Sequence, residues 1–164
     1  MNDLDNTIGC FTGHRELGGV SLDALVAALD RRLRFLYDEG VRHYYAGGAL
    51  GFDMFASVTL LNLKNELPEL SLTLALPCRI HTRGWSRGDI ELFAHIKSRA
   101  DEVVCLSDIY HPGCMSARNR FMVDRSAVCV CYLTQVSGGT AYTVGYARKR
   151  GLEVINLAKE LELS

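Results

Sequence analysis

Short apolar runs alternate with segments of helical periodicity along the whole chain. After Ser21, leucine and valine recur every three or four residues as far as Gly40, which predicts an amphipathic helix capped by the serine and ended by the glycine. Leu70–Leu76 is instead largely apolar throughout, as in a strand buried on both faces. The same patterns predict strands at Thr7–Thr12, His43–Ala46, Glu102–Leu106, Val128–Tyr132 and Glu153–Leu157, and helices at Gly51–Glu66, around Ile90–Ile96, at Ser116–Arg125 and at Thr140–Arg150.

This alternation of strands and helices predicts an α/β fold with a parallel sheet and helices on both faces. The chain has 164 residues, of which 48% are hydrophobic, enough for one core. There is no internal repeat, low-complexity stretch or linker. We therefore expect residues 1–164 to form a single domain.

Composition and charge narrow the functional classes. The formal net charge of -1 gives no overall attraction to nucleic acid or to an anionic membrane. No apolar run approaches the roughly 20 residues that span a bilayer, and the N-terminus lacks the basic and apolar regions of a signal peptide. We therefore expect a cytoplasmic protein. The Cys129-Val130-Cys131 spacing is not that of a zinc site, so we expect structural cysteines and no metal.

Three glycine-bearing loops each follow a predicted strand and precede a predicted helix. Glycine allows backbone amides to approach a ligand closely, and a helix that begins there adds unpaired N–H groups, so each loop can receive a phosphate. In a doubly wound parallel sheet all three loops lie at one edge, where a ligand crevice forms at the topological switch point. The candidate binding residues in these loops are Gly13, His14 and Arg15; Gly47, Gly48, Gly51 and Asp53; and Gly138, Gly139 and Thr140.

Five side chains in or near these loops carry candidate chemistry. Arg15 can make bidentate contacts with phosphate, and His14 titrates near neutrality. For Asp53 two interpretations stay open: it caps a helix through backbone amides, or it binds a ribose hydroxyl or water. Arg118 and Asn119 lie near the start of a predicted helix, and we expect Arg118 to supply further positive charge.

Together the motifs Phe11-Thr12-Gly13-His14-Arg15, Gly47–Asp53, Ala75-Leu76-Pro77, Gly113–Asp124 and Gly138–Thr143 closely resemble the YpsA-like family of the SLOG superfamily. The resemblance covers nearly the whole chain. It implies a Rossmann-like three-layer α/β/α sandwich with a mostly parallel, doubly wound sheet of about six strands. It also implies the binding of nucleotide-derived ligands and, in bacteria, a sensing or regulatory role linked to cell division or the cell envelope.

Two related families share parts of the pattern. The Lonely Guy phosphoribohydrolases are similar in the spacing of Met115, Arg118 and Met122, but Gly145 stands where their catalytic glutamate belongs, which argues against that enzymatic activity. The DNA-processing protein DprA is similar at Gly48–Asp53 and implies single-stranded DNA binding. The corresponding feature here is the basic segment from Arg79 to Arg99, which contains Trp85 and has a net charge of about +3.

The sequence therefore predicts a protein that binds a nucleotide or an ADP-ribose-like or NAD-like ligand, with no certain cofactor. Two alternatives stay open: a nucleotide N-glycosidase using Asp53 or Asp124 as its acid, and a module that binds partner protein or single-stranded DNA. Given the near-neutral net charge, nucleic acid and membrane are not expected as partners. A homodimer is compatible with the leucine-rich helices, although the core needs those helices in any case.

Overall fold

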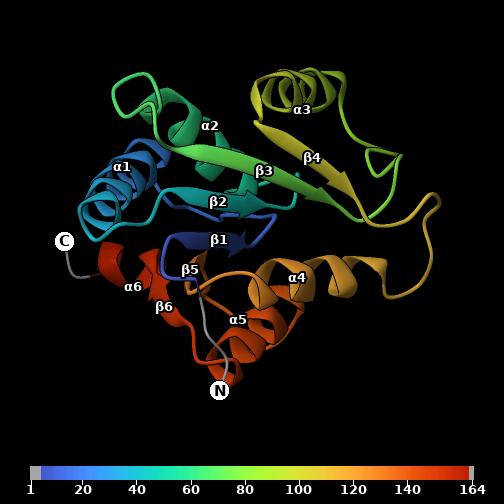
Figure 1. Cartoon of the computed structure of the whole chain (residues 1–164). Coiled ribbons are helices and arrows are strands. Elements are labelled where there is room, and N and C mark those ends of the chain that lie inside the picture. The colour runs from blue at the N-terminus through green and yellow to red at the C-terminus, as the bar shows by residue number, and fades with distance from the viewer. Residues whose placement is uncertain (1–4, 163–164) are drawn as a thin grey trace.

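In the computed structural model, which describes residues 5–162, six strands alternate with six helices (Figure 1). The strands are β1 (Ile8–Gly13), β2 (His43–Ala46), β3 (Ser71–Leu76), β4 (Glu102–Cys105), β5 (Val128–Tyr132) and β6 (Glu153–Asn156). The helices are α1 (Leu22–Asp38), α2 (Phe52–Leu63), α3 (Arg87–Arg99), α4 (Cys114–Asp124), α5 (Gly139–Lys149) and α6 (Leu157–Glu162).

All strand pairs are parallel, in the order β4-β3-β2-β1-β5-β6. Successive strands are added on one side of β1 as far as β4, after which the chain crosses over and places β5 on the other side. The topological switch point therefore lies between β1 and β5, where Gly13 is paired with Tyr132. This arrangement confirms the predicted parallel, doubly wound sheet.

Helices cover both faces of the sheet. The first three helices and α6 form one layer, in which α1 packs against α2 and α6, and α2 packs against α3. The other layer consists of α4 packed against α5, on the opposite side of the sheet in Figure 1. These three layers confirm the Rossmann-like α/β/α sandwich.

The core follows the periodicity of the sequence. Leu25, Leu29 and Leu33 of α1 are fully buried, and all five residues of β5 are buried. In the centre of the sheet the rings of Phe11 and Tyr44 stack with their centroids 5.0 Å apart. The central strands are therefore rigidly packed, and they fix the loops that leave their carboxyl ends.

Several boundaries differ from the predictions by one to three residues, and two of these differences have a clear structural cause. Helix α4 begins two residues before the predicted Ser116, because Gly113 takes the left-handed conformation (φ 86°) and starts the helix at Cys114. Strand β6 ends at Asn156, and α6, which was not predicted, follows it. The Asn156 side-chain oxygen accepts a hydrogen bond from the Ala158 amide at 3.1 Å, which caps this short helix.

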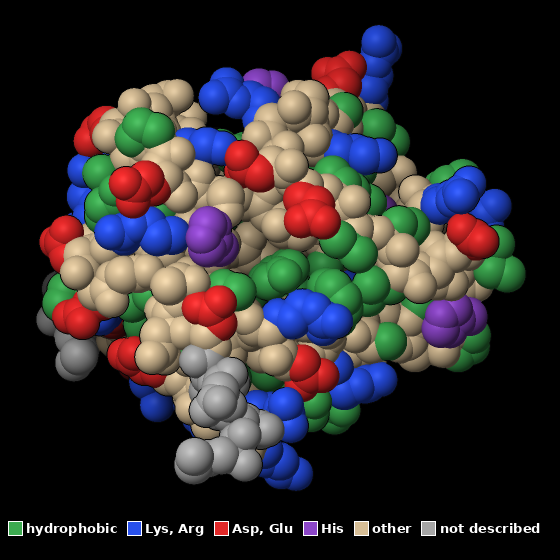
Figure 2. All heavy atoms as spheres, viewed as in Figure 1, with side chains coloured by type: hydrophobic (Ala, Val, Ile, Leu, Met, Phe, Trp, Pro, Cys, Tyr) green, Lys and Arg blue, Asp and Glu red, His purple; other side chains and the backbone are tan. Residues whose placement is uncertain are grey.

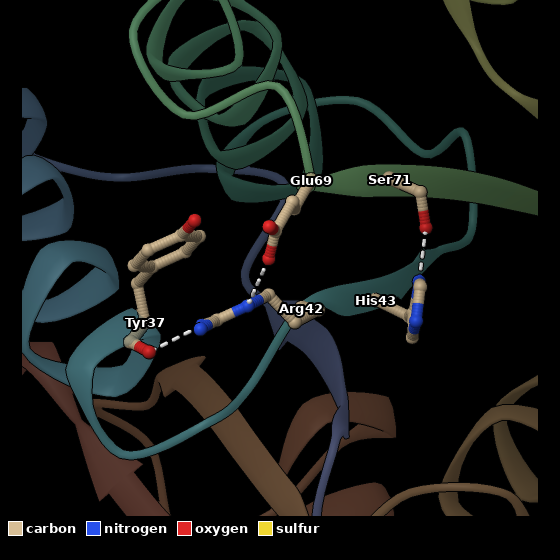
Figure 3. Close-up of polar contacts among 5 residues, drawn as sticks. All are labelled: Tyr37, Arg42, His43, Glu69 and Ser71. Atoms are coloured by element: carbon tan, nitrogen blue, oxygen red, sulfur yellow. Dashed lines mark hydrogen bonds and ion pairs between the residues drawn. The ribbon is translucent and has the colours of Figure 1, made fainter.

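A polar cluster lies at the amino-terminal edge of the sheet, where β2 and β3 begin, opposite the edge that carries the glycine loops (Figure 3). Arg42 donates hydrogen bonds to the Tyr37 carbonyl oxygen and, at 3.0 Å, to Glu69, while its guanidinium lies 3.5 Å from the centre of the Tyr37 ring. His43 Nδ1 is hydrogen-bonded to Ser71 Oγ at 2.6 Å. These contacts tie the strand starts together, far from the glycine loops.

Candidate functional site

His14 fixes the first glycine loop, between β1 and α1. Its amide donates to the Tyr132 carbonyl oxygen at 3.4 Å, and its carbonyl oxygen accepts from the Phe52 amide at 3.1 Å. The ring Nε2 accepts from the Thr134 amide at 2.9 Å, which places the proton of the neutral ring on Nδ1. Burial lowers the pKa of His14 and so favours this neutral form. His14 therefore anchors its neighbour Arg15, which is itself exposed.

Asp53 organises the second loop, between β2 and α2. Its Oδ2 accepts hydrogen bonds from the amides of Gly47 at 2.7 Å and Ala49 at 3.2 Å, and only 5% of the residue is exposed. Burial raises the pKa of Asp53, while the charge of Arg118 and the loop amides oppose that shift. Asp53 therefore caps amides of the preceding loop, not the helix itself, because α2 has no side-chain cap at its N-cap residue Gly51. The two amides are therefore used by the protein itself.

Arg118 enters this loop from α4, on the other layer. It donates to the carbonyl oxygen of Gly47 through Nη1 and to Asn119 Oδ1 through Nε at 2.7 Å. Only 6% of the residue is exposed, and burial lowers its pKa, which the charge of Asp53 opposes. Arg118 is thus a buried cation that joins α4 to the ends of the central strands.

Close packing accounts for the glycines of the first two loops. A Cβ at Gly13 would lie 2.5 Å from the Phe52 side chain, and one at Gly47 would overlap the guanidinium of Arg118. Gly51 has φ 84°, and a Cβ there would lie 2.5 Å from the His14 carbonyl oxygen. Glycine is needed at these positions whether or not a ligand is bound.

The third loop differs, because its glycines border open space. A Cβ at Gly138 or at Gly139 would meet nothing within 4 Å. Gly138, with φ 103°, is the N-cap of α5, and no side chain caps this helix. Thr140, expected as a cap, is the second residue of the helix. Within residues 5–162 no acceptor is hydrogen-bonded to the amides of Gly139 and Thr140.

The loops after β1 and β5 enclose a cavity of about 310 Å³. It lies at the switch point, where ligands bind in folds of this kind. Nine of the twelve candidate residues line it, namely Gly13, His14, Arg15, Asp53, Arg118, Asn119, Gly138, Gly139 and Thr140, and the structure thus brings them together. Gly47, Gly48 and Gly51 do not line it. Sequence reasoning missed Gln135, which belongs to no motif. Met122 was noted only for its spacing from Arg118 and was not predicted to line a cavity.

A second and larger cavity, of about 800 Å³, adjoins the first. It is formed mainly by the β3–α3 loop and the β4–α4 loop, which project at the right of Figure 1. Figure 2 shows hydrophobic, basic and acidic side chains close together on this projecting part. The residues that line both cavities are Gly13, Arg15, Ala49 and Arg118.

Three further findings concern metal ions, cysteines and membranes. Between residues 5 and 162 no group of three or more His, Cys, Asp or Glu side chains is placed to hold a metal ion. The six cysteines all fall in that range and are free thiols. None of the helices described is long and apolar enough to cross a membrane.

The fold and the crevice define an α/β protein with a Rossmann-like sheet and a loop-lined cavity at its switch point. The chain belongs to the YspA SLOG family, which residues 11–155 match. This match confirms the resemblance that the glycine motifs predicted.

Known relatives agree with this assignment. The chain is 26% identical over 133 residues to a UPF0398 protein of Bacillus thuringiensis, which covers 79% of this chain and 72% of the relative. A UPF0398 protein of Bacillus cereus shares the same identity and coverage.

Two solved structures share the fold. DNA processing protein A of Helicobacter pylori, described with a single-stranded DNA binding mode, aligns with a TM-score of 0.62 and 19% identity over 91% of this chain. DNA processing protein A of Streptococcus pneumoniae aligns with a TM-score of 0.64 and 15% identity over 89% of this chain. The chain spans 64% and 48% of those two proteins.

Proposed function

We propose that the protein binds a nucleotide or an ADP-ribose-like ligand, with a phosphate in the smaller cavity, and that it serves as a sensor or regulator. One observation carries this proposal: exposed Arg15 lines the same cavity as the uncapped first turn of α5. A phosphate there would receive charge-assisted hydrogen bonds from a guanidinium and from free helix amides.

The surroundings of Arg15 support this role. Within residues 5–162 it forms no ion pair, in contrast to Arg32, Arg34 and Arg42, which are each paired with a carboxylate. The hydrogen bonds of the neighbouring His14 fix the backbone of this loop before any ligand arrives. They therefore reduce the conformational entropy that the loop loses on binding. Arg15 is therefore an exposed cation on an anchored backbone, and it is available to an anion.

A ligand panel tests the proposal. Nucleoside monophosphates, ribose 5-phosphate, ADP-ribose and NAD at saturating concentration should include at least one compound that raises the melting temperature of the protein, because ligand binding to the native state stabilises it. Failure of every compound to shift the melting temperature would contradict the proposal.

The geometry supports the glycosidase alternative less well than it supports the binding of a nucleotide. Asp53 is the only carboxylate among the described residues that line the smaller cavity, and loop amides already occupy it. Asp124 accepts from Tyr146 Oη at 2.6 Å, pairs with Arg150 at 3.3 Å, and lies outside the cavity. Release of free base from nucleoside monophosphates, abolished by Asp53→Asn, would restore this alternative.

Single-stranded nucleic acid is a second candidate ligand. The shared fold with DNA processing protein A weakens the expectation that nucleic acid is not a partner. The larger cavity also contains Arg15, Arg83 and Trp85, the combination of cations and an aromatic ring that such ligands need. Binding of a labelled oligonucleotide should then weaken with salt and with Arg83→Ala, and no binding at low salt would exclude it.

A further inference from the structure

The larger cavity has a lining unlike that of the smaller one. Apolar and aromatic side chains dominate it, contributed by Leu50, Ile80, Trp85, Ile109, Tyr110 and Met115. Three of these are well exposed, at 76% for Ile80, 74% for Ile109 and 64% for Tyr110. Single exposed apolar residues are ordinary on protein surfaces, but here several converge on one hollow. Such a lining favours an apolar or planar group over a second phosphate.

Packing contacts hold one wall of this cavity in place. His81 Nε2 donates to the Gly48 carbonyl oxygen at 3.0 Å, and the His81 ring lies edge-on to Trp85 and Phe93 at 5.3 and 4.8 Å. Trp85 and Phe93 in turn lie edge-on at 6.0 Å. The Trp85 ring is thus supported by the core before a ligand binds.

An ion pair joins the two loops that form the walls of the larger cavity. Arg79 on the β3–α3 loop pairs with Asp108 on the β4–α4 loop at 3.2 Å. Both side chains are mostly exposed, so the pair contributes little free energy and marks the place where the two loops meet. Asp108 directly precedes Ile109 and Tyr110, and these two apolar side chains line the same cavity as Trp85.

We propose that the larger cavity binds the planar base of the ligand whose phosphate occupies the smaller cavity; this inference rests on the proposed function. The connection is physical, because Arg15 and Ala49 line both spaces. A ligand that extends from one space to the other would place its ring among Trp85, Tyr110 and Ile109. Aromatic side chains stack on any base, and Arg83 adds a cation that can lie over the ring.

The protein carries its own probe for this subsite, because Trp85 is the single tryptophan of the chain. Titration with adenosine monophosphate should change the Trp85 fluorescence. Ribose 5-phosphate has the phosphate and sugar without the base, so it should raise the melting temperature and leave that fluorescence unchanged. Adenosine monophosphate should also bind at least about fivefold more tightly than ribose 5-phosphate, the lower end of what stacking one base contributes.

Variants separate the two subsites. Tyr110→Ala should weaken adenosine monophosphate binding by about fivefold or more and leave ribose 5-phosphate binding as in the wild type. Ile109→Ala is the second variant, with the same expected direction, and both side chains are exposed enough for the fold to tolerate their loss. Phe35→Ala is the matched control, since Phe35 is 52% exposed and lines neither cavity.

Two results would overturn the base subsite. The first is equal affinity for the two ligands with constant Trp85 fluorescence, in which case the phosphate site would stand alone. The second is a Trp85 signal that depends on protein concentration without ligand, which would show that a second copy covers the cavity. If neither compound binds, the base subsite fails, and the proposed function fails with it only if ADP-ribose and NAD do not bind either.

Discussion

The carboxylate of Asp53 accepts a hydrogen bond at 2.7 Å from the amide of Gly47, six residues before it in the chain. The carbonyl oxygen of Gly47 accepts in turn from Arg118. A buried anion and a buried cation thus bond to the two polar groups of one glycine, and they join α2 to α4 at the carboxyl edge of the sheet. Asp53 and Arg118 are therefore primarily part of the framework that supports the cavity.

Removal of the Asp53 carboxylate should destabilise the protein. Asp53→Ala leaves two loop amides unpaired and Arg118 without its nearby countercharge, so we expect a loss of about 2–4 kcal/mol in the free energy of unfolding. Asp53→Asn keeps an acceptor oxygen and should cost less. Urea denaturation measures both effects. Asp124→Ala, which removes an exposed ion pair with Arg150 and an exposed hydrogen bond from Tyr146, is the control at about 1 kcal/mol or less. Equal losses for Asp53→Ala and Asp124→Ala would refute this role.

Two glycine substitutions should separate packing from binding. Gly47→Ala places a methyl group against Arg118 and should cost about 1–3 kcal/mol. Gly139→Ala meets no atom within 4 Å, so stability should change by no more than about 0.5 kcal/mol. Because Gly139 lines the smaller cavity, its methyl group should nevertheless weaken the binding of ribose 5-phosphate. Denaturation curves combined with calorimetric titration distinguish the two effects. Unchanged binding by Gly139→Ala would count against a phosphate at α5.

Topology was the part of this structure that the sequence predicted well. The leucines of α1 repeat with clear helical spacing, and β3 and β5 are apolar because both of their faces are covered. Once the strands are parallel, the loops after β1 and β5 must meet at one edge. The meeting of Arg15 with Gly138 and Gly139 in one cavity therefore follows from local patterns.

The sequence did not show which glycine loops are required by packing and which are open to a ligand. A glycine that avoids Arg118 and a glycine that borders open space look alike in sequence, and only the packing of α4 separates Gly47 from Gly139. The larger cavity is lined by segments that are distant in the sequence, and two of these meet at the pair Arg79–Asp108. A useful signal was present in Ile109 and Tyr110, two large apolar residues in the loop after β4 at the same edge.

Folding stability should fall as the solution is acidified below pH 6.5. Burial lowers the pKa of both His14 and His81 from the ordinary value of 6.5, so the unfolded chain binds protons that the folded protein does not. The contribution of these two histidines to folding stability is complete above pH 6.5. It is lost as the pH falls towards their pKa values in the folded protein. The raised pKa of Asp53 acts with the opposite sign, since stability from this group falls as the pH rises above 3.8.

Histidine variants test this pH dependence. Urea midpoints measured between pH 5.5 and 7.5 should vary less with pH in His14→Gln and His81→Gln than in the wild type, because glutamine can keep the hydrogen bond and does not titrate. The exposed His95→Gln is the matched control. If the urea midpoint of both variants changed with pH as much as that of the wild type, groups other than these histidines would cause the pH dependence.

The central claim is that Arg15 and the first turn of α5 bind a phosphate group. Calorimetric titration of adenosine monophosphate into the wild type, Arg15→Ala and the exposed surface control Arg31→Ala tests it most directly. Loss of a charge-assisted hydrogen bond should weaken binding to Arg15→Ala by about 10- to 150-fold with an unchanged melting temperature, while Arg31→Ala binds as the wild type does. Equal affinity of all three proteins, or no binding to the wild type, would contradict the claim.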